Sequence, residues 1–344
     1  MKVATFLNER RRPPKTRRVL ALLAGFFALT TFIAPGPLPE RAATAEGTLI
    51  ATPVALNPGD PAQRRLGGLV FRRGWALRSD QPRFGGISAM HVADGEVTAI
   101  SDAGDLLLFP LPGAGPARVR VIALPLGHAP PTRKRDRDTE ALAVHGGHIW
   151  VAFERHNLVA RHRRADGRLE SFARPEAMRR WGRNSGPETL VRLADGRFLA
   201  IEEGGGDDYS RVALFDGDPA AVATRALTGR YRRVPGYRAT DAAQLPDGRL
   251  LILNRRASLG RFPAVLTIAD MPQWRQNATI EGRELARLAR PLTTDNMEAL
   301  SVAREGGRTI VRIASDDNFM GFQRTLLLEF ELAERPNREP ASSS

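Results

Sequence analysis

The chain of 344 residues contains no cysteine, which excludes both a disulfide framework and a lipoprotein anchor on a cysteine. Lysine is nearly absent as well, since only three of the 51 basic residues are lysines and the rest are arginines. This bias is typical of a GC-rich genome and does not by itself indicate a partner. Without disulfides, the stability of the fold must come from burial.

Several catalytic signatures are also missing. No Gly-x-Ser-x-Gly elbow occurs, which argues against the serine of an α/β-hydrolase. The six histidines include no His-Glu-x-x-His zinc motif, and no glycine-rich phosphate loop leads into a helix. The formal net charge of +13 comes from arginines that are scattered along the chain, without the basic stripe and aromatics of a nucleic-acid surface. We therefore expect no nucleic-acid partner.

Only one long hydrophobic run occurs, "VLALLAGFFALTTFIA" (19–34), and it follows a cluster of arginines. The small residues "ATA" (43–45) then provide the pattern that a signal peptidase needs. Residues 1–45 are therefore predicted to be a signal peptide and leader, and the protein is expected to be periplasmic or secreted, in a Gram-negative bacterium. The alternative is an inner-membrane anchor through 19–34, although 16 residues are fewer than the roughly 20 that span a bilayer.

What is present after residue 80 is a repeat. Each unit runs through an apolar stretch, turns at Asp-Gly or Gly-Gly, and continues with a second apolar stretch, which is the pattern of a tight β-hairpin. The five units are "ISAMHVADGEVTAISD" (87–102), "TEALAVHGGHIWVAFE" (139–154), "PETLVRLADGRFLAIEE" (187–203), "TDAAQLPDGRLLILNR" (240–255) and "MEALSVAREGGRTIVRIASD" (297–316).

The units recur every 48 to 57 residues, and further strand-like runs follow each hairpin. Four short antiparallel strands at that period predict an all-β fold, a β-propeller. We favour six blades, with N-terminal strands helping to close the ring, and keep five as the alternative. Residues 46–335 are predicted to form this single domain, and 336–344 a flexible C-terminal tail.

Charged residues recur at the start and end of each hairpin. Counting seven to nine residues either way from the turn glycine gives two columns, in which we expect Glu298 to face Asp316 and Glu140 to face Glu154 across their hairpins. In a propeller these positions would converge on one mouth of a central channel. The first column contains Ser88, Glu140, Glu188, Asp241 and Glu298, and the second contains Asp102, Glu154, Glu203, Arg255 and Asp316.

Crowded carboxylates repel one another, so their pKa values rise unless a cation lies among them. Oxygen ligands without histidine or thiolate favour calcium, with magnesium as the alternative. The predicted metal ligands, which include the "SDDN" segment that follows the fifth hairpin, are Glu140, Glu154, Glu188, Glu203, Asp241, Glu298, Asp316, Asp317 and Asn318. The alternative for any one of them is a turn former or a solvated strand end.

Three arginines lie close to these carboxylates in the sequence, namely Arg255, Arg256 and Arg324. A guanidinium among bound cations would bind a phosphate, so we predict that these residues bind the substrate. The alternative is that they form ion pairs that relieve the crowding of the carboxylates. The sequence identifies no nucleophile or general base.

The motifs "RFGGISAM", "DTEALAV", "GPETLVRLADGRFLAIEE", "TDAAQLPDGRLLILNRR", "DNMEALSV" and "SDDNFMGFQRTLLLEFEL" resemble the bacterial phytase-like β-propeller family, labelled "esterase-like activity of phytase". The resemblance covers roughly 64–332. It implies an exported propeller with a likeness to β-propeller phytases, which bind calcium in an acidic channel and hydrolyse phosphate esters. A shared fold does not transfer a reaction, however.

The leading hypothesis is therefore a monomeric, divalent-metal-dependent hydrolase that acts on a small-molecule phosphate or other ester. One alternative is a non-catalytic propeller that binds a cation, a sugar or a cell-envelope partner at the acidic mouth. Another is an enzyme that hydrolyses lactones or sugar acids at the same site.

Overall fold

The described part of the chain is built almost wholly of β-strands. The computed structural model describes residues 43–126, 137–182, 185–204, 208–256 and 262–333. All of them belong to the second of the chain's two units, Glu40–Ser344. The predicted leader up to residue 42 and the predicted tail at 336–344 thus lie outside the described residues. Among the residues that are described, no helix is both long and apolar enough to cross a membrane.

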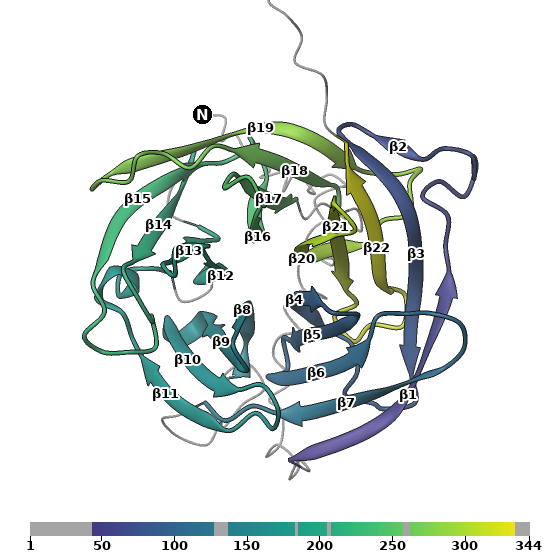
Figure 1. Cartoon of the computed structure of the whole chain (residues 1–344), viewed down its shortest axis with the longest axis horizontal. Helices are drawn as coiled ribbons and strands as arrows, with labels where there is room; N and C mark the ends of the chain where they lie inside the picture. The colour runs from purple at the N-terminus through teal and green to yellow at the C-terminus, as the bar shows by residue number, and fades with distance from the viewer. Residues whose placement is uncertain (1–42, 127–136, 183–184, 205–207, 257–261, 334–344) are drawn as a thin grey trace, which may run out of the picture. The chain divides into compact units, whose positions relative to one another are not determined.

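Five four-stranded antiparallel units surround a common centre (Figure 1). The first contains β4 (Ile87–Ala93), β5 (Glu96–Ser101), β6 (Asp105–Pro110) and β7 (Ala117–Ala123). The second contains β8 (Thr139–His145), β9 (His148–Phe153), β10 (Leu158–Arg163) and β11 (Leu169–Ala173). The third contains β12 (Pro187–Arg192), β13 (Phe198–Glu202), β14 (Tyr209–Phe215) and β15 (Ala226–Arg232). The fourth contains β16 (Arg238–Gln244), β17 (Leu250–Arg255), β18 (Ala264–Ala269) and β19 (Ala278–Leu288).

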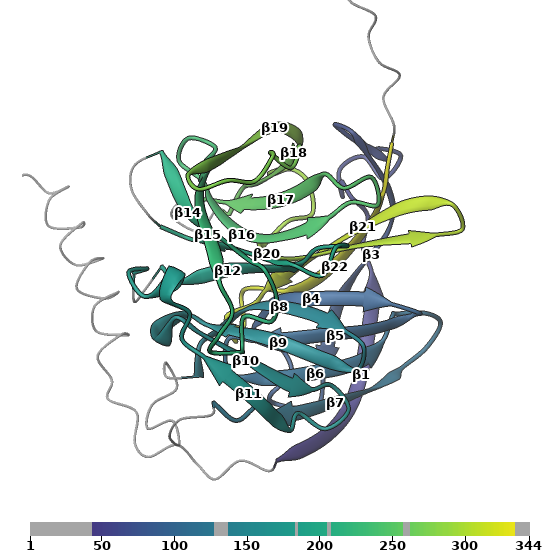
Figure 2. The ribbon, with the colours of Figure 1, turned by 60° about the vertical axis from the view of Figure 1, so that its left-hand side comes forward.

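The fifth unit is completed by a strand from the other end of the domain. It contains β20 (Asn296–Glu305), β21 (Arg308–Asp316), β22 (Thr325–Leu332) and β3 (Leu69–Ser79). Its inner hairpin is the longest of the five, as the residue counts around its turn predicted, and it reaches beyond the others in Figure 2. Pairing of β3 with β22 covers an edge that would otherwise be open.

The β-propeller prediction is confirmed, but the sixth blade that we favoured is not found among the described residues. The N-terminal strands do not form a separate blade, because β3 enters the fifth unit and β1 (Thr44–Pro53) pairs with both β3 and β7. The short β2 (Arg65–Leu66) pairs with β3. The N-terminal strands therefore close the ring, and five units suffice.

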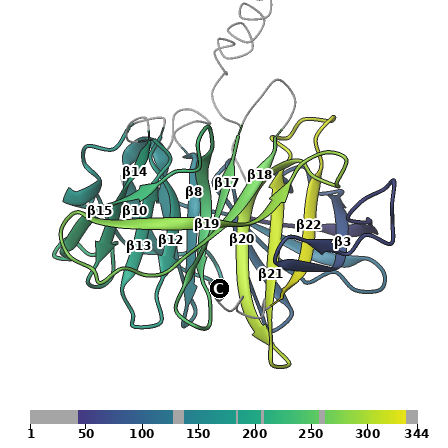
Figure 3. The same ribbon diagram turned by 90° about the horizontal axis from the view of Figure 1, so that it is seen from above.

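The units are held together by burial between neighbours. The described residues form five clusters of buried apolar side chains, and each cluster lies between one unit and the next. In one of them, for example, Leu142 of the second unit packs in the same cluster as Ile100 of the first. A fully buried leucine or isoleucine contributes about 1.5–3 kcal/mol. At the periphery β15 and β19 pair in parallel, and Figure 3 shows β19 spanning from β15 to β18. Burial of this kind replaces the disulfides that the chain cannot form.

Each of the five inner hairpins has a β-bulge near the start of its first strand. The pairing skips one residue at the same place in every unit, and these residues are Ser88, Glu140, Glu188, Thr240 and Glu298. Four of them belong to the first column predicted from the sequence. In the fourth unit the bulge falls at Thr240, next to the predicted Asp241.

The bulges change the predicted pairing. Asp316 lies opposite Asn296, not opposite Glu298, and the amide of Glu154 donates to the carbonyl of Asp138, not of Glu140. The prediction of directly opposed carboxylates was therefore wrong in register. The reason is twofold: these two hairpins are centred between their two turn glycines and not on the second of them, and the bulge inserts one further residue.

Candidate carboxylate site

The functional candidates gather where the first strand of each unit begins and the second ends, which we call the mouth end. Each bulge turns its residue away from the regular alternation of the strand, as bulges near binding sites commonly do. Glu140 and Glu188 lie at such bulges, whereas Glu154 and Glu203 follow the second strands β9 and β13. Glu154 is also the first residue of a short 3-10 helix, η2 (Glu154–His156).

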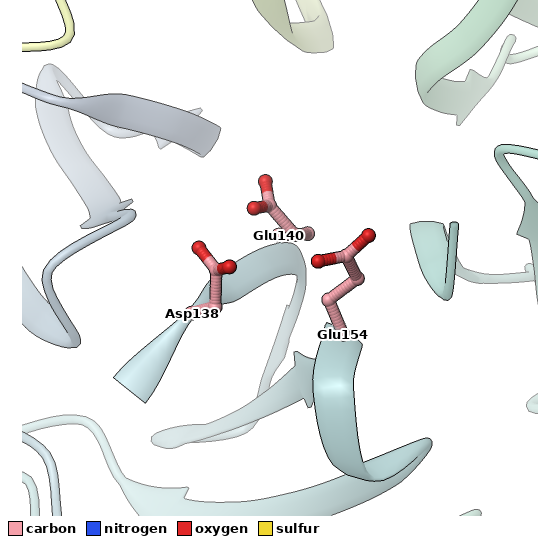
Figure 4. A group of neighbouring side chains, drawn as sticks. All are labelled: Asp138, Glu140 and Glu154. Atoms are coloured by element: carbon pink, nitrogen blue, oxygen red, sulfur yellow. The ribbon is translucent and has the colours of Figure 1, made fainter. Parts of the chain in front are cut away.

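Two overlapping groups of carboxylates form at this end. One oxygen from each of Asp138, Glu140 and Glu154 lies within 4.8 Å of the others, and the same holds for Glu154, Glu188 and Glu203. Figure 4 shows the first three side chains pointing toward a common space. We call these five residues the carboxylate cluster. Glu154 belongs to both of its groups.

Burial and mutual repulsion disfavour the ionised forms of the cluster. The pKa of Glu140 is raised well above its ordinary value, first by burial and then by the charges of Glu188 and Asp138. Burial, followed by Glu203 and Glu154, likewise raises the pKa of Glu188. Burial and the charge of Asp138 raise the pKa of Glu154 to about 7, although a hydrogen bond from the amide of Gly186 opposes this. A bound cation would relieve the repulsion.

The donor set fits a divalent metal. The cluster offers only carboxylate oxygens, the ligands that calcium and magnesium prefer, and it has no nitrogen or sulfur donor that would favour zinc. The spacing of the oxygens lets three carboxylates share one ion. The structure is thus compatible with a divalent cation without distinguishing which one.

A second acidic pair lies beside the cluster. Burial, and then the charges of Glu298 and Asp102, raise the pKa of Asp316 to about 9. Burial also raises the pKa of Glu298, against the opposing effects of Arg255 and Asn296. Asn296 donates to both carboxylates, at 2.8 Å to Glu298 and 3.4 Å to Asp316. The predicted proximity of Glu298 and Asp316 therefore holds, even though their register does not.

Arg255 is the mostly buried cation among these acids. Its Nη1 donates to Asn296 Oδ1 at 2.6 Å and forms an ion pair with Glu298 Oε1 at 2.9 Å. Burial alone would lower the pKa of Arg255, but the charges of Glu298 and Glu188 raise it. These contacts support the alternative that Arg255 relieves the crowding of the carboxylates.

Five other predicted residues have different partners. Asp241 Oδ2 accepts from the amide of Leu300 at 2.7 Å and so joins the fourth unit to the fifth. Asp317 accepts from backbone amides, and Asn318 donates to Gln323 at 3.2 Å. The guanidinium of Arg256 lies 5.1 Å from the ring centroid of Tyr237, and Arg324 pairs with Asp295 at 3.9 Å. None of these five belongs to the carboxylate cluster.

Three residues of the site were not predicted from the sequence: Asp138, Arg238 and Asn296. Each lies two positions before a bulge residue, Thr240 in the case of Arg238, and opposite the end of the second strand. Arg238 donates to Glu203 Oε2 at 3.0 Å. A third column, two residues before the first one, would have revealed Asp138 and Asn296, whereas in the fourth unit it falls on Ala239 and misses Arg238 by one position.

We expect Arg255→Met to destabilise the metal-free protein more at pH 8 than at pH 5. A carboxyl group whose pKa is higher in the folded protein than in the unfolded chain destabilises the fold as it ionises. This loss of stability builds up as the pH rises from the pKa in the unfolded chain to the pKa in the folded protein. Arg255 lowers the pKa of Glu298 and Glu188, so its loss extends that range upward. Removing one partner of a buried pair costs roughly 3–5 kcal/mol, which we expect at pH 8, with clearly less at pH 5.

Urea unfolding in a chelator at both pH values measures this difference. Arg256→Met is the matched control, because Arg256 is the next residue in the chain but is exposed, with its guanidinium over the ring of Tyr237. Equal losses at the two pH values for Arg255→Met would show that Arg255 does not balance the carboxylates.

Comparison with known proteins identifies the family. A sequence profile of the phytase-like family, described as "Esterase-like activity of phytase", matches residues 82–319. None of the curated proteins compared with the chain matches it.

Solved structures resemble the chain at low sequence identity. Glutaminyl cyclase of Myxococcus xanthus shows 13% identity and a TM-score of 0.43, covering 77% of this chain and 97% of its own. The RS223 β-xylosidase shows 14% identity and a TM-score of 0.41, with coverages of 74% and 94%. The Cps50 (Swd1) β-propeller domain of Myceliophteria thermophila shows 12% and 0.36, with coverages of 73% and 98%.

Proposed function

The chain belongs to the phytase-like family, and from this premise we propose that it is a divalent-metal-dependent hydrolase of small phosphate or other esters. The observation that carries the proposal is the carboxylate cluster, in which Glu154 is shared by two groups of oxygen ligands. Calcium is the cation that we favour, with magnesium as the alternative. A metal bound there would neutralise ester oxygens and lower the pKa of an attacking water.

The residues around the cluster have distinct roles in this proposal. Glu154 and Glu188 would hold the cation, together with Asp138, Glu140 and Glu203. Arg238 is half exposed and donates to Glu203, so its guanidinium is accessible to an anionic substrate at the rim. Arg255 is mostly buried by comparison, and its ion pair with Glu298 opposes the rise in the pKa of that carboxyl group that burial causes.

We further propose that the protein acts as a monomer outside the cytoplasm, either periplasmic or secreted, or anchored in the inner membrane through 19–34. The substrate would be a small molecule, and we propose no nucleic-acid partner. Fractionation of cells that express the tagged full chain tests the location, and recovery in the cytoplasm would contradict it.

We expect the purified domain to release product from phosphate or carboxylic esters only when calcium or magnesium is supplied. A panel of 4-nitrophenyl phosphate, bis(4-nitrophenyl) phosphate, 4-nitrophenyl acetate and a γ-lactone, assayed with each ion and with chelator, measures this. Stabilisation by metal without turnover of any ester would instead indicate a non-catalytic binding propeller. Turnover of the lactone alone would indicate the lactone-processing alternative.

A further inference from the structure

A loop of unusual surface character lies at the mouth end. Residues 317–324 join β21 to β22, and we call them the β21–β22 loop. The connection from second to third strand lies at the mouth end in every unit, because the second strand ends there. Asp316, which accepts a hydrogen bond from Asn296 of the site at 3.4 Å, directly precedes the loop.

The loop exposes large apolar side chains. Among the described residues seven large hydrophobic side chains are exposed, and three of them fall within this one stretch of four residues. Phe319 is 38% exposed, Met320 48% and Phe322 80%. Single exposed hydrophobic residues are ordinary, but a contiguous group beside a polar site commonly marks an interaction surface.

The loop is held in place by acidic residues. Asp317 Oδ1 accepts from the amides of Gly86 at 2.8 Å and Phe319 at 3.1 Å, while its Oδ2 accepts from Thr325 Oγ1 at 2.8 Å. At the other end Asp295 accepts from the amide of Arg324 at 3.2 Å. The exposed side chains thus project from an anchored backbone.

The backbone of the loop is also strained. Asn318 and Phe319 have φ angles of 49° and 52°, in the left-handed region that a bulky residue such as phenylalanine rarely adopts. Such strain persists only where surrounding contacts impose it, and it concentrates at functional sites. Here the contacts of Asp317 impose it.

Phe319 connects the loop to the acidic residues. A Cβ built on Gly86 would lie 2.5 Å from Asp102 Oδ1 and 2.5 Å from a ring carbon of Phe319. Gly86 is therefore enclosed between the carboxylate and the aromatic ring, and its φ of 61° also favours glycine. Only Gly86 thus separates the apolar side chain of Phe319 from the carboxylate of Asp102 at the mouth end.

Resting on the hydrolase function proposed above, we propose that the β21–β22 loop binds the apolar part of the ester substrate. The substrates would then be esters that carry an aryl or alkyl group beside the reacting phosphate or carboxyl group, not esters that are charged throughout. Met320 and Phe322 would contact the apolar group, while the reacting group would lie at the carboxylate cluster. Removing such contacts from an apolar subsite typically changes selectivity by roughly tenfold or more.

The double variant Met320→Ser/Phe322→Ser tests this proposal, because both side chains are exposed and their loss should leave the fold intact. With calcium present, we compare kcat/KM for 4-nitrophenyl octanoate with that for 4-nitrophenyl acetate, and kcat/KM for phenyl phosphate with that for glycerol 2-phosphate. We expect both ratios to fall roughly tenfold in the double variant, because KM rises for the ester that carries the larger apolar group. The matched control is Val222→Ser, since Val222 is 91% exposed and lies between β14 and β15, where third strands end away from the mouth.

Unchanged ratios in the double variant would overturn the proposal. The proposal would also be overturned if the double variant no longer sedimented with phosphatidylglycerol vesicles, as the wild type did, while its substrate selectivity stayed unchanged. That result would assign the loop to a membrane surface instead. Failure of the wild-type protein to hydrolyse any of the four esters would contradict the hydrolase function separately. In that case calorimetry would compare the affinities for phenylphosphonate and methylphosphonate in the wild type and in the double variant. The same preference for phenylphosphonate in both proteins would overturn the proposed role of the loop.

Discussion

Replacing Glu154 by glutamine should remove most of the gain in thermal stability that calcium or magnesium provides. Glu154 is the one residue that both groups of the carboxylate cluster share, so its loss removes a charged ligand from each. We expect metal affinity to fall by roughly 100-fold or more, and metal-dependent ester hydrolysis with it. At a metal concentration 100 times the dissociation constant, the wild-type protein should gain about 2.7 kcal/mol, and most of this should disappear.

Thermal unfolding with metal and with chelator measures the effect. The metal-free variant should be at least as stable as the wild type above pH 7, because the pKa of Glu154 is raised to about 7 and its ionised form is disfavoured in the fold. Glu176→Gln serves as control, since Glu176 is an exposed glutamate at the start of η3 (Glu176–Met178). A full metal response in Glu154→Gln would show that the cluster is not the metal site.

Replacing Arg312 by methionine should destabilise the fold by roughly 3–5 kcal/mol, which lowers Tm by roughly 10 °C. Arg312 is among the largest fully buried side chains, and its guanidinium pairs with Glu329 at 2.7 Å and with Glu305 at 2.7 Å. Removing the arginine leaves the buried Glu329 with only the partly exposed Arg72 and Arg73. Loss of its fully buried partner leaves the charge of Glu329 less well compensated, which is costly for a buried carboxylate.

The double variant Arg312→Met/Glu329→Leu separates the charge from the packing. Because it removes both charges, it should be more stable than either single variant, and a double-mutant cycle from urea unfolding gives the coupling. Arg308→Met is the control, since Arg308 lies on the same strand β21 but is exposed. Additive losses in the cycle would contradict the interpretation that the pair acts as a unit.

Some of the metal ligands predicted from the sequence lie in the carboxylate cluster and others do not, and the difference depends on whether local or long-range contacts place them. Glu140, Glu154, Glu188 and Glu203 come together because each lies a few residues from its own hairpin turn, so local counting located them. Asp241 was misplaced by a single position, since nothing in its own segment distinguishes it from Thr240. The bulge depends on packing against neighbouring units, and a shift of one residue turns a side chain to the other face.

The sequence by itself determined the five hairpins and the acidic character of one end. Asp-Gly and Gly-Gly turns between apolar runs are local signals, and they act before any distant contact forms. The regular spacing of the hairpins was enough to predict a propeller. It was also enough to identify four of the five carboxylates that crowd together, because the second and third units repeat them at corresponding places.

The sequence predicted that N-terminal strands help to close the ring, but only the tertiary structure decided which strand does so and how each charge is balanced. The pairing of β3 with β22 joins segments at opposite ends of the domain, so no local sequence pattern predicts it. Because β3 completes the fifth unit, the described residues contain five four-stranded units and no separate sixth one. The ion pair of Arg255 with Glu298 likewise joins two units, so it too depends on a long-range contact. The anchoring of the β21–β22 loop by Asp317 and Gly86 is likewise a long-range contact. Such contacts depend on which units become neighbours, and this is settled only when the apolar faces between them are buried.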